Sequence, residues 1–226
     1  MLALNLERIL RRIERARLAY SPHQIISLVA VSKYQNKEQV RALYECGQRA
    51  FGENKVQDLR TKSEDLDDLA IEWHFIGHLQ ENKINMLLSL NPALLHSLDS
   101  LKLALALQKR LKEYKQGERK IRALLQVNAA NEPSKSGVSV ESAKQLYEQI
   151  ATTCPNIMLE GIMSIGAHTD ERAKIEQSFK LTRDVFDSLK PSGAKILSMG
   201  MSGDFEIAIA YGANLVRIGS KLFEEK

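Results

Sequence analysis

The segment Leu28-Val29-Ala30-Val31-Ser32-Lys33 is a short apolar run that ends in a lysine. Polar residues follow it at once, and a helical pattern begins at Asn36, a residue type suited to a helix N-cap. A strand that is apolar on both faces is typical of a buried parallel sheet, because helices cover both of its sides. The segment therefore predicts the first strand of an α/β protein.

The same alternation of apolar strands and helical patterns continues along the chain. The expected strands are residues 28–32, 49–54, 71–77, 93–98, 121–127, 158–165, 195–199 and 215–218. The expected helices are residues 2–18, 36–46, 55–69, 79–90, 101–114, 140–152, 170–189 and 204–211. Eight strands in this order favour one (β/α)8 TIM barrel over residues 1–226, with an extra helix at its N-terminus.

A doubly wound open sheet is the competing topology, but it usually has fewer strands. It also calls for a glycine-rich phosphate loop after the first strand. The segment Ser32-Lys33-Tyr34-Gln35-Asn36-Lys37-Glu38 is not such a loop. The barrel is therefore the fold that we expect.

Charge and cysteine usage narrow the function classes. The net charge is +4, and the densest positive run, residues 8–17, is interrupted by Glu14, as in a solvated helix face. A nucleic-acid site would need a basic stripe with interleaved aromatic residues, which the sequence lacks. Cys46 and Cys154 are far apart and predict reduced thiols. The N-terminus is too charged for a secretory signal and no run is long enough to span a membrane, so we expect a cytoplasmic protein.

Lys33 has two interpretations at this point. It is either the solvent end of the first strand or a reactive amine. Burial at the end of a strand would disfavour the ammonium form, and a neutral lysine amine forms Schiff bases with aldehydes and ketones. Nothing in this hexapeptide decides between them.

A phosphate site is expected beside Lys33. Barrel active sites lie at the C-terminal ends of the strands, and phosphate commonly binds after strands seven and eight. Ser202 follows the seventh strand, and Gly219 follows Arg217 at the end of the eighth. Taken singly, Ser202 could be only a helix cap and Gly219 only a turn. Because strand eight closes onto strand one, Lys33 would lie next to this phosphate site.

A lysine beside a phosphate site is compatible with two ligands, pyridoxal 5′-phosphate (PLP) and the sugar phosphate of a lysine-dependent aldolase. Arg217 favours PLP. A guanidinium facing the pyridine nitrogen would leave that nitrogen unprotonated, which weakens the ring as an electron sink. Such a site holds the cofactor well and supports most transamination or decarboxylation poorly.

Several motifs together resemble the pyridoxal phosphate homeostasis protein family, the single-domain relatives of the alanine racemase barrel. They are VAVSK (29–33), FGENKVQD (51–58), WHFIGHLQENK (73–83), SKSG (134–137), GIMSIG (161–166), SMGMSGDFEIAI (198–209) and VRIGSKLF (216–223). The resemblance covers essentially the whole chain in order. It implies a barrel of the alanine racemase N-terminal-domain type that binds PLP.

The resemblance also implies roles for individual residues. Lys33 would carry PLP as a reversible internal aldimine, and Arg217 would face the pyridine nitrogen. Ser202, Gly219 and Ser220 would hold the phosphate, Asn54 would lie near the ring, and Met199 would contribute to the cofactor wall.

Two departures from the family are visible. Tyr34-Gln35-Asn36 lacks the proline that many members have there, and the chain ends in Glu224-Glu225-Lys226 where relatives often carry glycine and arginine. Compared with alanine racemase, the chain has no room for the C-terminal β-domain, whose tyrosine is the second catalytic base. No tyrosine here is an evident substitute.

The implied function is therefore a non-catalytic role in vitamin B6 homeostasis. PLP would be buffered, or handed by transimination to free amino acids or to a lysine of a recipient PLP-dependent apoenzyme, and we expect a monomer. A weak amino-acid racemase and a Schiff-base lysine aldolase are the alternatives. His74 and His78 do not have the helical spacing of a zinc pair, so no metal is expected, and Lys135 and Gly137 are interpreted as a solvated turn.

Overall fold

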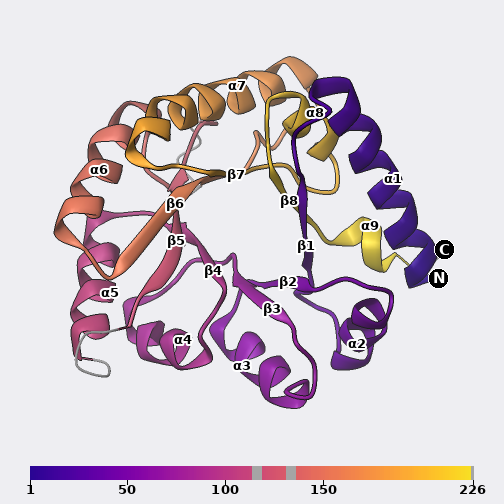
Figure 1. Ribbon diagram of the computed structural model, residues 1–226, viewed down its shortest axis with the longest axis horizontal. Helices are drawn as coiled ribbons and strands as arrows, with labels where there is room; N and C mark the ends of the chain where they lie inside the picture. Colours follow the sequence, from indigo (N-terminus) through magenta and orange to yellow (C-terminus); the bar gives the residue numbers. More distant parts are fainter. Residues whose placement is uncertain (114–118, 131–135, 225–226) are drawn as a thin grey trace.

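Eight parallel strands close into a barrel in the computed structural model, which describes residues 1–113, 119–130 and 136–224. The strand order around the barrel follows the chain, as Figure 1 shows. The strands are β1 (Ser27–Val31), β2 (Ala50–Glu53), β3 (Glu72–Phe75), β4 (Leu94–Leu98), β5 (Ile121–Val127), β6 (Ile157–Ser164), β7 (Ile196–Ser198) and β8 (Leu215–Ile218). The predicted barrel is confirmed, and the open sheet is excluded.

Helices surround the barrel. They are α1 (Leu2–Tyr20), α2 (Lys37–Glu45), α3 (Val56–Asp65), α4 (Ile84–Leu90), α5 (Leu101–Glu113), α6 (Val140–Thr153), α7 (Arg172–Leu189), α8 (Phe205–Ala210) and α9 (Ser220–Phe223), with short 3-10 turns at η1 (Glu81–Lys83) and η3 (Lys190–Ser192). Asn36 caps α2 as expected, accepting a hydrogen bond from the Gln39 amide. None of the described helices is both long and apolar enough to cross a membrane.

Two elements differ from the sequence expectation. The helix expected over residues 79–90 is α-helical only from Ile84, because the chain after β3 first forms an irregular turn and then η1. The short helix α9, directly after β8, was not expected. It follows a glycine and spans one turn, which is too short for a periodic pattern to reveal.

Side chains alternate between the inside and the outside of the barrel. The smaller apolar cluster fills the barrel interior and consists of Val29, Leu94, Leu124, Met163 and Leu215. The larger cluster lies between the strands and the surrounding helices, where Phe51 and Trp73 pack against each other. The barrel is therefore a packed core whose open end is available for a site.

The helix α1 covers the side of the barrel where the chain ends, next to α8 and α9 (Figure 1). Its residues Leu6, Ile9 and Ile13 are buried. The side-chain amide nitrogen of Asn5, Nδ2, donates to the carbonyl oxygens of Leu222 and Glu224, at 3.2 and 3.0 Å. The two ends of the described chain are thus joined by packing and by hydrogen bonds.

Closure of the barrel places the first and last strands side by side. In the parallel pairing of β1 with β8, Val29 is opposite Arg217 and Ala30 is opposite Ile218. Continuing this register brings the residues after β1 next to those after β8. Lys33 and Gly219 therefore lie at the same end of the barrel, as the sequence predicted.

Candidate functional site

A cavity of about 780 Å³ opens at the C-terminal ends of the strands. Six of the seven predicted cofactor-binding residues line it, namely Lys33, Asn54, Ser202, Arg217, Gly219 and Ser220. They come from the ends of β1, β2, β7 and β8, four strands that are contiguous around the closed barrel. The fold thus brings together residues that are far apart in the sequence.

Lys33 lies at the mouth of this cavity. Its side chain is half-buried, so the sequence argument from full burial was wrong on this point. Its Nζ lies 5.4 Å from the ring centre of Tyr34, and within the described part of the chain it has no ion-pair partner. Tyr34 also lines the cavity and has a φ of 76°, a left-handed conformation that is uncommon for a bulky residue. The sequence analysis gave Tyr34 no role.

A buried ion pair fixes the backbone that precedes Lys33. Glu53, at the end of β2, is fully buried, and its Oε1 accepts hydrogen bonds from Ser32 Oγ and Lys62 Nζ, both at 2.6 Å. Lys62 Nζ also donates to the carbonyl oxygen of Ser32 at 2.8 Å. The ends of β1 and β2 are therefore tied to α3 directly behind Lys33. The sequence analysis missed this cluster.

The loops after β7 and β8 form a cradle that suits an anion. The amide N–H of Gly219 donates to Ser202 Oγ at 3.3 Å, so the two loops are in direct contact. A Cβ at position 219 would lie 3.2 Å from the carbonyl oxygen of Val31, which leaves little room for a side chain. Among the described residues that line the cavity there is no carboxylate, whereas Lys33 and Arg217 are cationic. This charge balance favours a phosphate.

Arg217 forms part of the cavity floor and is only 4% exposed. Its Nη1 donates to Ser198 Oγ at 2.6 Å, and its Nη2 donates to the carbonyl oxygen of Ser164 at 2.9 Å. Burial lowers the pKa of Arg217 to about 10, against the opposing effect of Asp204. The guanidinium is therefore a buried cation at neutral pH.

Asn54 is held at the cavity wall by close backbone packing. A Cβ on Gly77 would collide with the carbonyl oxygen of Asn54, so only glycine fits between these two loops. The hydroxyl of Ser97 donates to the carbonyl oxygen of Gly77 and fixes the loop from the other side. The predicted strand 71–77 is shorter in the structure, because β3 ends at Phe75. Gly77 lies in the loop that follows and helps to form the cavity wall.

Met199 is not among the residues that line the cavity. It is fully buried in the apolar cluster between the barrel and its helices. The preceding residue, Ser198, points inward to Arg217, and alternation directs Met199 outward. Its predicted place in the cofactor wall is therefore not supported. Gln126, which the sequence analysis did not single out, lines the cavity and donates to the carbonyl oxygen of Ser136 at 2.8 Å.

The two histidines considered for zinc, His74 and His78, have different surroundings. His74 is buried in the barrel interior, and its Nδ1 is 2.8 Å from His96 Nε2. His78 lines the cavity and lies 3.2 Å from Asp99. Among residues 1–113, 119–130 and 136–224 no cluster of three potential metal ligands is present. Lys135 is outside the described residues, whereas Gly137 is described and has a φ of 127°.

The closed barrel and its cavity define a protein of the alanine racemase N-terminal class. The family model described as alanine racemase, N-terminal domain, matches residues 4–225. Alanine racemase from Corynebacterium glutamicum has a TM-score of 0.75 at 16% identity, covering 100% of this chain and 61% of the racemase chain. At that identity the similarity concerns the fold alone.

Two further relatives are similar along their whole length. A pyridoxal phosphate homeostasis protein of Helicobacter pylori is 57% identical over 220 residues, which cover 97% of each chain. The structure of PipY from Synechococcus elongatus with PLP bound has a TM-score of 0.84 at 30% identity, covering 99% of this chain and 100% of that one. The chain belongs to the pyridoxal phosphate homeostasis protein family.

Proposed function

We propose that this protein binds PLP and serves vitamin B6 homeostasis, with Lys33 as the amine that holds the cofactor reversibly. The observation that carries the proposal is the placement of a half-buried lysine and an anion cradle in one cavity whose described lining residues include no carboxylate. PipY, which has PLP in its structure, is similar over its full length and supports the choice of ligand. When bound, PLP supplies an aldehyde that condenses reversibly with primary amines.

Different residues around the cavity would bind different parts of the cofactor. Ser202, Gly219 and Ser220 would hold the phosphate, and Asn54 would lie near the ring. Arg217 would donate an N–H to the pyridine nitrogen. Because its pKa of about 10 keeps it charged at neutral pH, Arg217 can donate to that nitrogen but cannot accept its proton. An unprotonated ring withdraws electrons weakly, which fits a carrier better than an enzyme.

Release would occur by exchange of amines. Lys33 lies at an open mouth, so a free amino acid or a lysine of a recipient PLP-dependent apoenzyme could displace it without turnover. We propose that the protein acts as a monomer in the cytoplasm. Both cysteines are free in the structure, Cys46 exposed and Cys154 buried, which fits a reducing compartment.

A spectrum of the protein mixed with PLP, followed by borohydride reduction and peptide mass mapping, tests this function. We expect visible absorption and a phosphopyridoxyl group on Lys33, both lost in Lys33→Ala and retained in Lys55→Ala. Lys55 is an exposed lysine close to the site that does not line the cavity, which makes it a matched control. A protein that takes up no PLP would refute the proposal and favour the lysine aldolase.

A weak racemase is the second candidate, and one observation favours it. Tyr34 is the one described tyrosine that lines the cavity, so it is the candidate for a second base. The measurement is exchange of the α-hydrogen of L- and D-alanine in D2O with the PLP-loaded protein. The carrier function predicts no exchange. Exchange that is lost in Tyr34→Phe would establish the racemase instead.

A further inference from the structure

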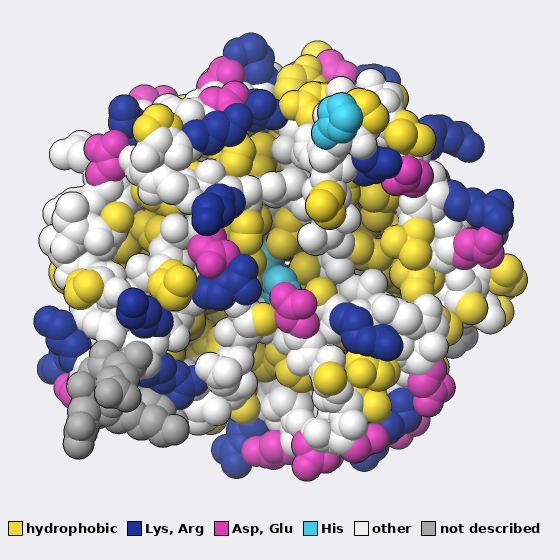
Figure 2. Space-filling view, viewed as in Figure 1, with side chains coloured by type: hydrophobic (Ala, Val, Ile, Leu, Met, Phe, Trp, Pro, Cys, Tyr) yellow, Lys and Arg dark blue, Asp and Glu magenta, His cyan; other side chains and the backbone are white. Residues whose placement is uncertain are grey.

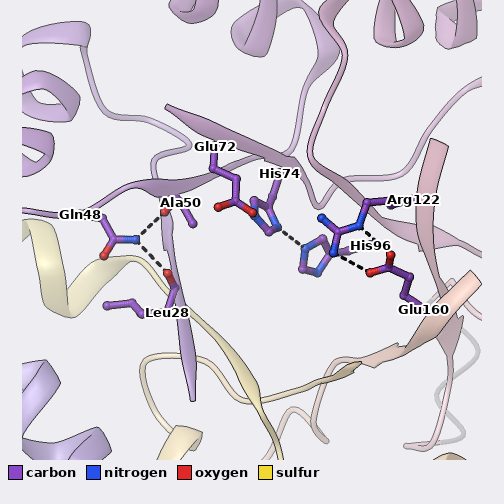
Figure 3. A network of polar contacts seen from close by, with 8 residues as sticks. All are labelled: Leu28, Gln48, Ala50, Glu72, His74, His96, Arg122 and Glu160. Carbon is purple, nitrogen blue, oxygen red and sulfur yellow. Dashed lines mark hydrogen bonds and ion pairs between the residues drawn. The ribbon is translucent and has the colours of Figure 1, made fainter. Parts of the chain in front are cut away.

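A continuous chain of side-chain hydrogen bonds crosses the barrel interior from Arg217 to Glu72. Arg217 Nη1 is 2.6 Å from Ser198 Oγ, which is 3.2 Å from His96 Nδ1. His96 Nε2 is 2.8 Å from His74 Nδ1, and His74 Nε2 is 3.2 Å from Glu72 Oε1. Figure 3 shows His74 between Glu72 and His96. The three inner members are buried, so water cannot replace a lost partner there.

With one proton on each imidazole ring, the carboxylate end of this hydrogen-bond chain sets the direction of every hydrogen bond in it. An arginine only donates and a carboxylate only accepts. Starting from Glu72, each ring then donates from Nε2 and accepts at Nδ1, so Ser198 donates to His96 Nδ1 and accepts from Arg217. His96 Nε2–H then donates to His74 Nδ1, and His74 Nε2–H donates to Glu72. Both histidines are assigned as neutral rings with the proton on Nε2.

The charges around the chain agree with this assignment. Burial lowers the pKa of His96 well below its usual value, and the charge of Arg217 acts in the same direction. His96 is therefore neutral and can accept from Ser198. At the other end, the hydrogen bond from His74 lowers the pKa of Glu72 and keeps it a carboxylate.

The Glu72 end of the hydrogen-bond chain is accessible from outside the protein. Glu72 and His74 line a second cavity of about 400 Å³, formed by residues at the N-terminal ends of the strands together with Leu10. Figure 2 shows a hollow near the middle of one face, with a histidine inside and charged side chains around it. Arg122 also lines this cavity and pairs with Glu160 of β6 at 2.6 Å. This ion pair lies beside the hydrogen-bond chain but is not part of it (Figure 3).

We propose that Ser198, His96, His74 and Glu72 are positioning residues that orient the Arg217 guanidinium toward the cofactor. The proposal rests on the proposed function, in which Arg217 faces the pyridine nitrogen. The chain occupies Nη1 and the Ser164 carbonyl occupies Nη2, so the guanidinium cannot rotate without losing a buried hydrogen bond. Glu72 then influences the cofactor from the opposite end of the barrel.

The first test uses the protein without cofactor. Nitrogen-15 NMR of the histidine rings reports which nitrogen carries the proton. We expect Nε2–H for both His74 and His96 in the wild type and in Glu72→Gln, which keeps an oxygen acceptor. Glu72→Leu removes the acceptor and should change the tautomer populations of both rings. Glu160→Gln removes a carboxylate at the same end of the barrel but outside the chain, and should leave the rings unchanged.

The second test measures the dissociation constant for PLP of the same proteins, after circular dichroism has shown that each is folded. We expect Ser198→Ala to raise the constant about tenfold and Glu72→Leu about fivefold, with Glu72→Gln and Glu160→Gln within twofold of wild type. A His96 signal unaffected by Glu72→Leu, or equal effects of Glu72→Leu and Glu160→Gln, would overturn the proposal. Wild-type protein that binds no PLP would refute the proposed function, whereas wild-type affinity in Ser198→Ala would refute only the positioning role.

Discussion

The hydroxyl of Ser32 donates a 2.6 Å hydrogen bond to Oε1 of Glu53, and neither residue has any exposed surface. The carboxylate also pairs with Lys62, whose ammonium reaches back to the Ser32 carbonyl. The backbone next to Lys33 is thus held from behind, while the Lys33 side chain faces the cavity. A reactive lysine on a short strand end needs such support, because a small displacement of the amine costs a large part of its reactivity.

Loss of the Glu53 carboxylate should therefore destabilise the protein and weaken cofactor binding together. Glu53→Ala leaves a largely buried Lys62 without its partner, at a cost of about 3 kcal/mol of unfolding free energy. Urea unfolding and PLP titration measure the two effects. Glu64→Ala is the control, because it breaks an exposed pair with Arg60 on α3, the helix that carries Lys62. It should change neither the unfolding free energy nor the affinity for PLP. Similar results for the two variants would contradict the anchoring role.

The sequence predicted the barrel and most of the cavity for a simple physical reason. Apolar runs mark buried parallel strands, and residues that follow such strands meet at one end of a closed barrel, which located Lys33, Ser202, Arg217 and Gly219. Met199, which was assigned by similarity, does not line the cavity, because strand alternation directs it outward.

The polar clusters could not be predicted in the same way. Glu53 and Lys62 come from two elements, and the chain from Glu72 to Arg217 joins four strands. A single sequence contains no signal for which buried polar side chains will meet across a barrel. It shows only that such residues are present in apolar strands. His74 in β3 and His96 in β4 are two such residues. Each predicts that some hydrogen-bond partner exists, since a histidine buried in a strand needs one, but not which residue it is.

Ser202 provides a test of the phosphate cradle that contains its own control. Its Oγ accepts from Gly219 and is available to donate to a phosphate oxygen. We expect Ser202→Ala to weaken PLP binding about tenfold, since a hydrogen bond to a charged group contributes about 1.5–3 kcal/mol. Binding of pyridoxal, which lacks the phosphate, should not change. A parallel loss for both ligands would place the phosphate elsewhere in the cavity.

Gly77 should be intolerant of any side chain. Gly77→Ala forces a methyl group against the Asn54 carbonyl, and the atoms that it would meet are all backbone, so no flexible side chain can move away. We expect a loss of about 3 kcal/mol in unfolding free energy, at the upper end for overpacking. Gly203→Ala is the control in the same cavity wall, because a Cβ there meets no atom within 4 Å. If urea unfolding finds Gly77→Ala as stable as Gly203→Ala, the close contact is not a constraint.

His96 should make the apoprotein less stable in mild acid. Its pKa is well below 6.5 in the folded chain and near 6.5 in the unfolded chain, so between those values the unfolded chain binds more protons. Stability therefore rises with pH in this range and is lost as the pH falls below about 6.5, by up to about 1.4 kcal/mol per unit. From pH 7 to pH 5, urea unfolding of the wild type should show about 2 kcal/mol more loss than His96→Gln, which cannot titrate. Parallel stability curves for the two proteins would mean that the pKa of His96 is not lowered in the barrel, and the assignment of His96 as a neutral acceptor would lose its support.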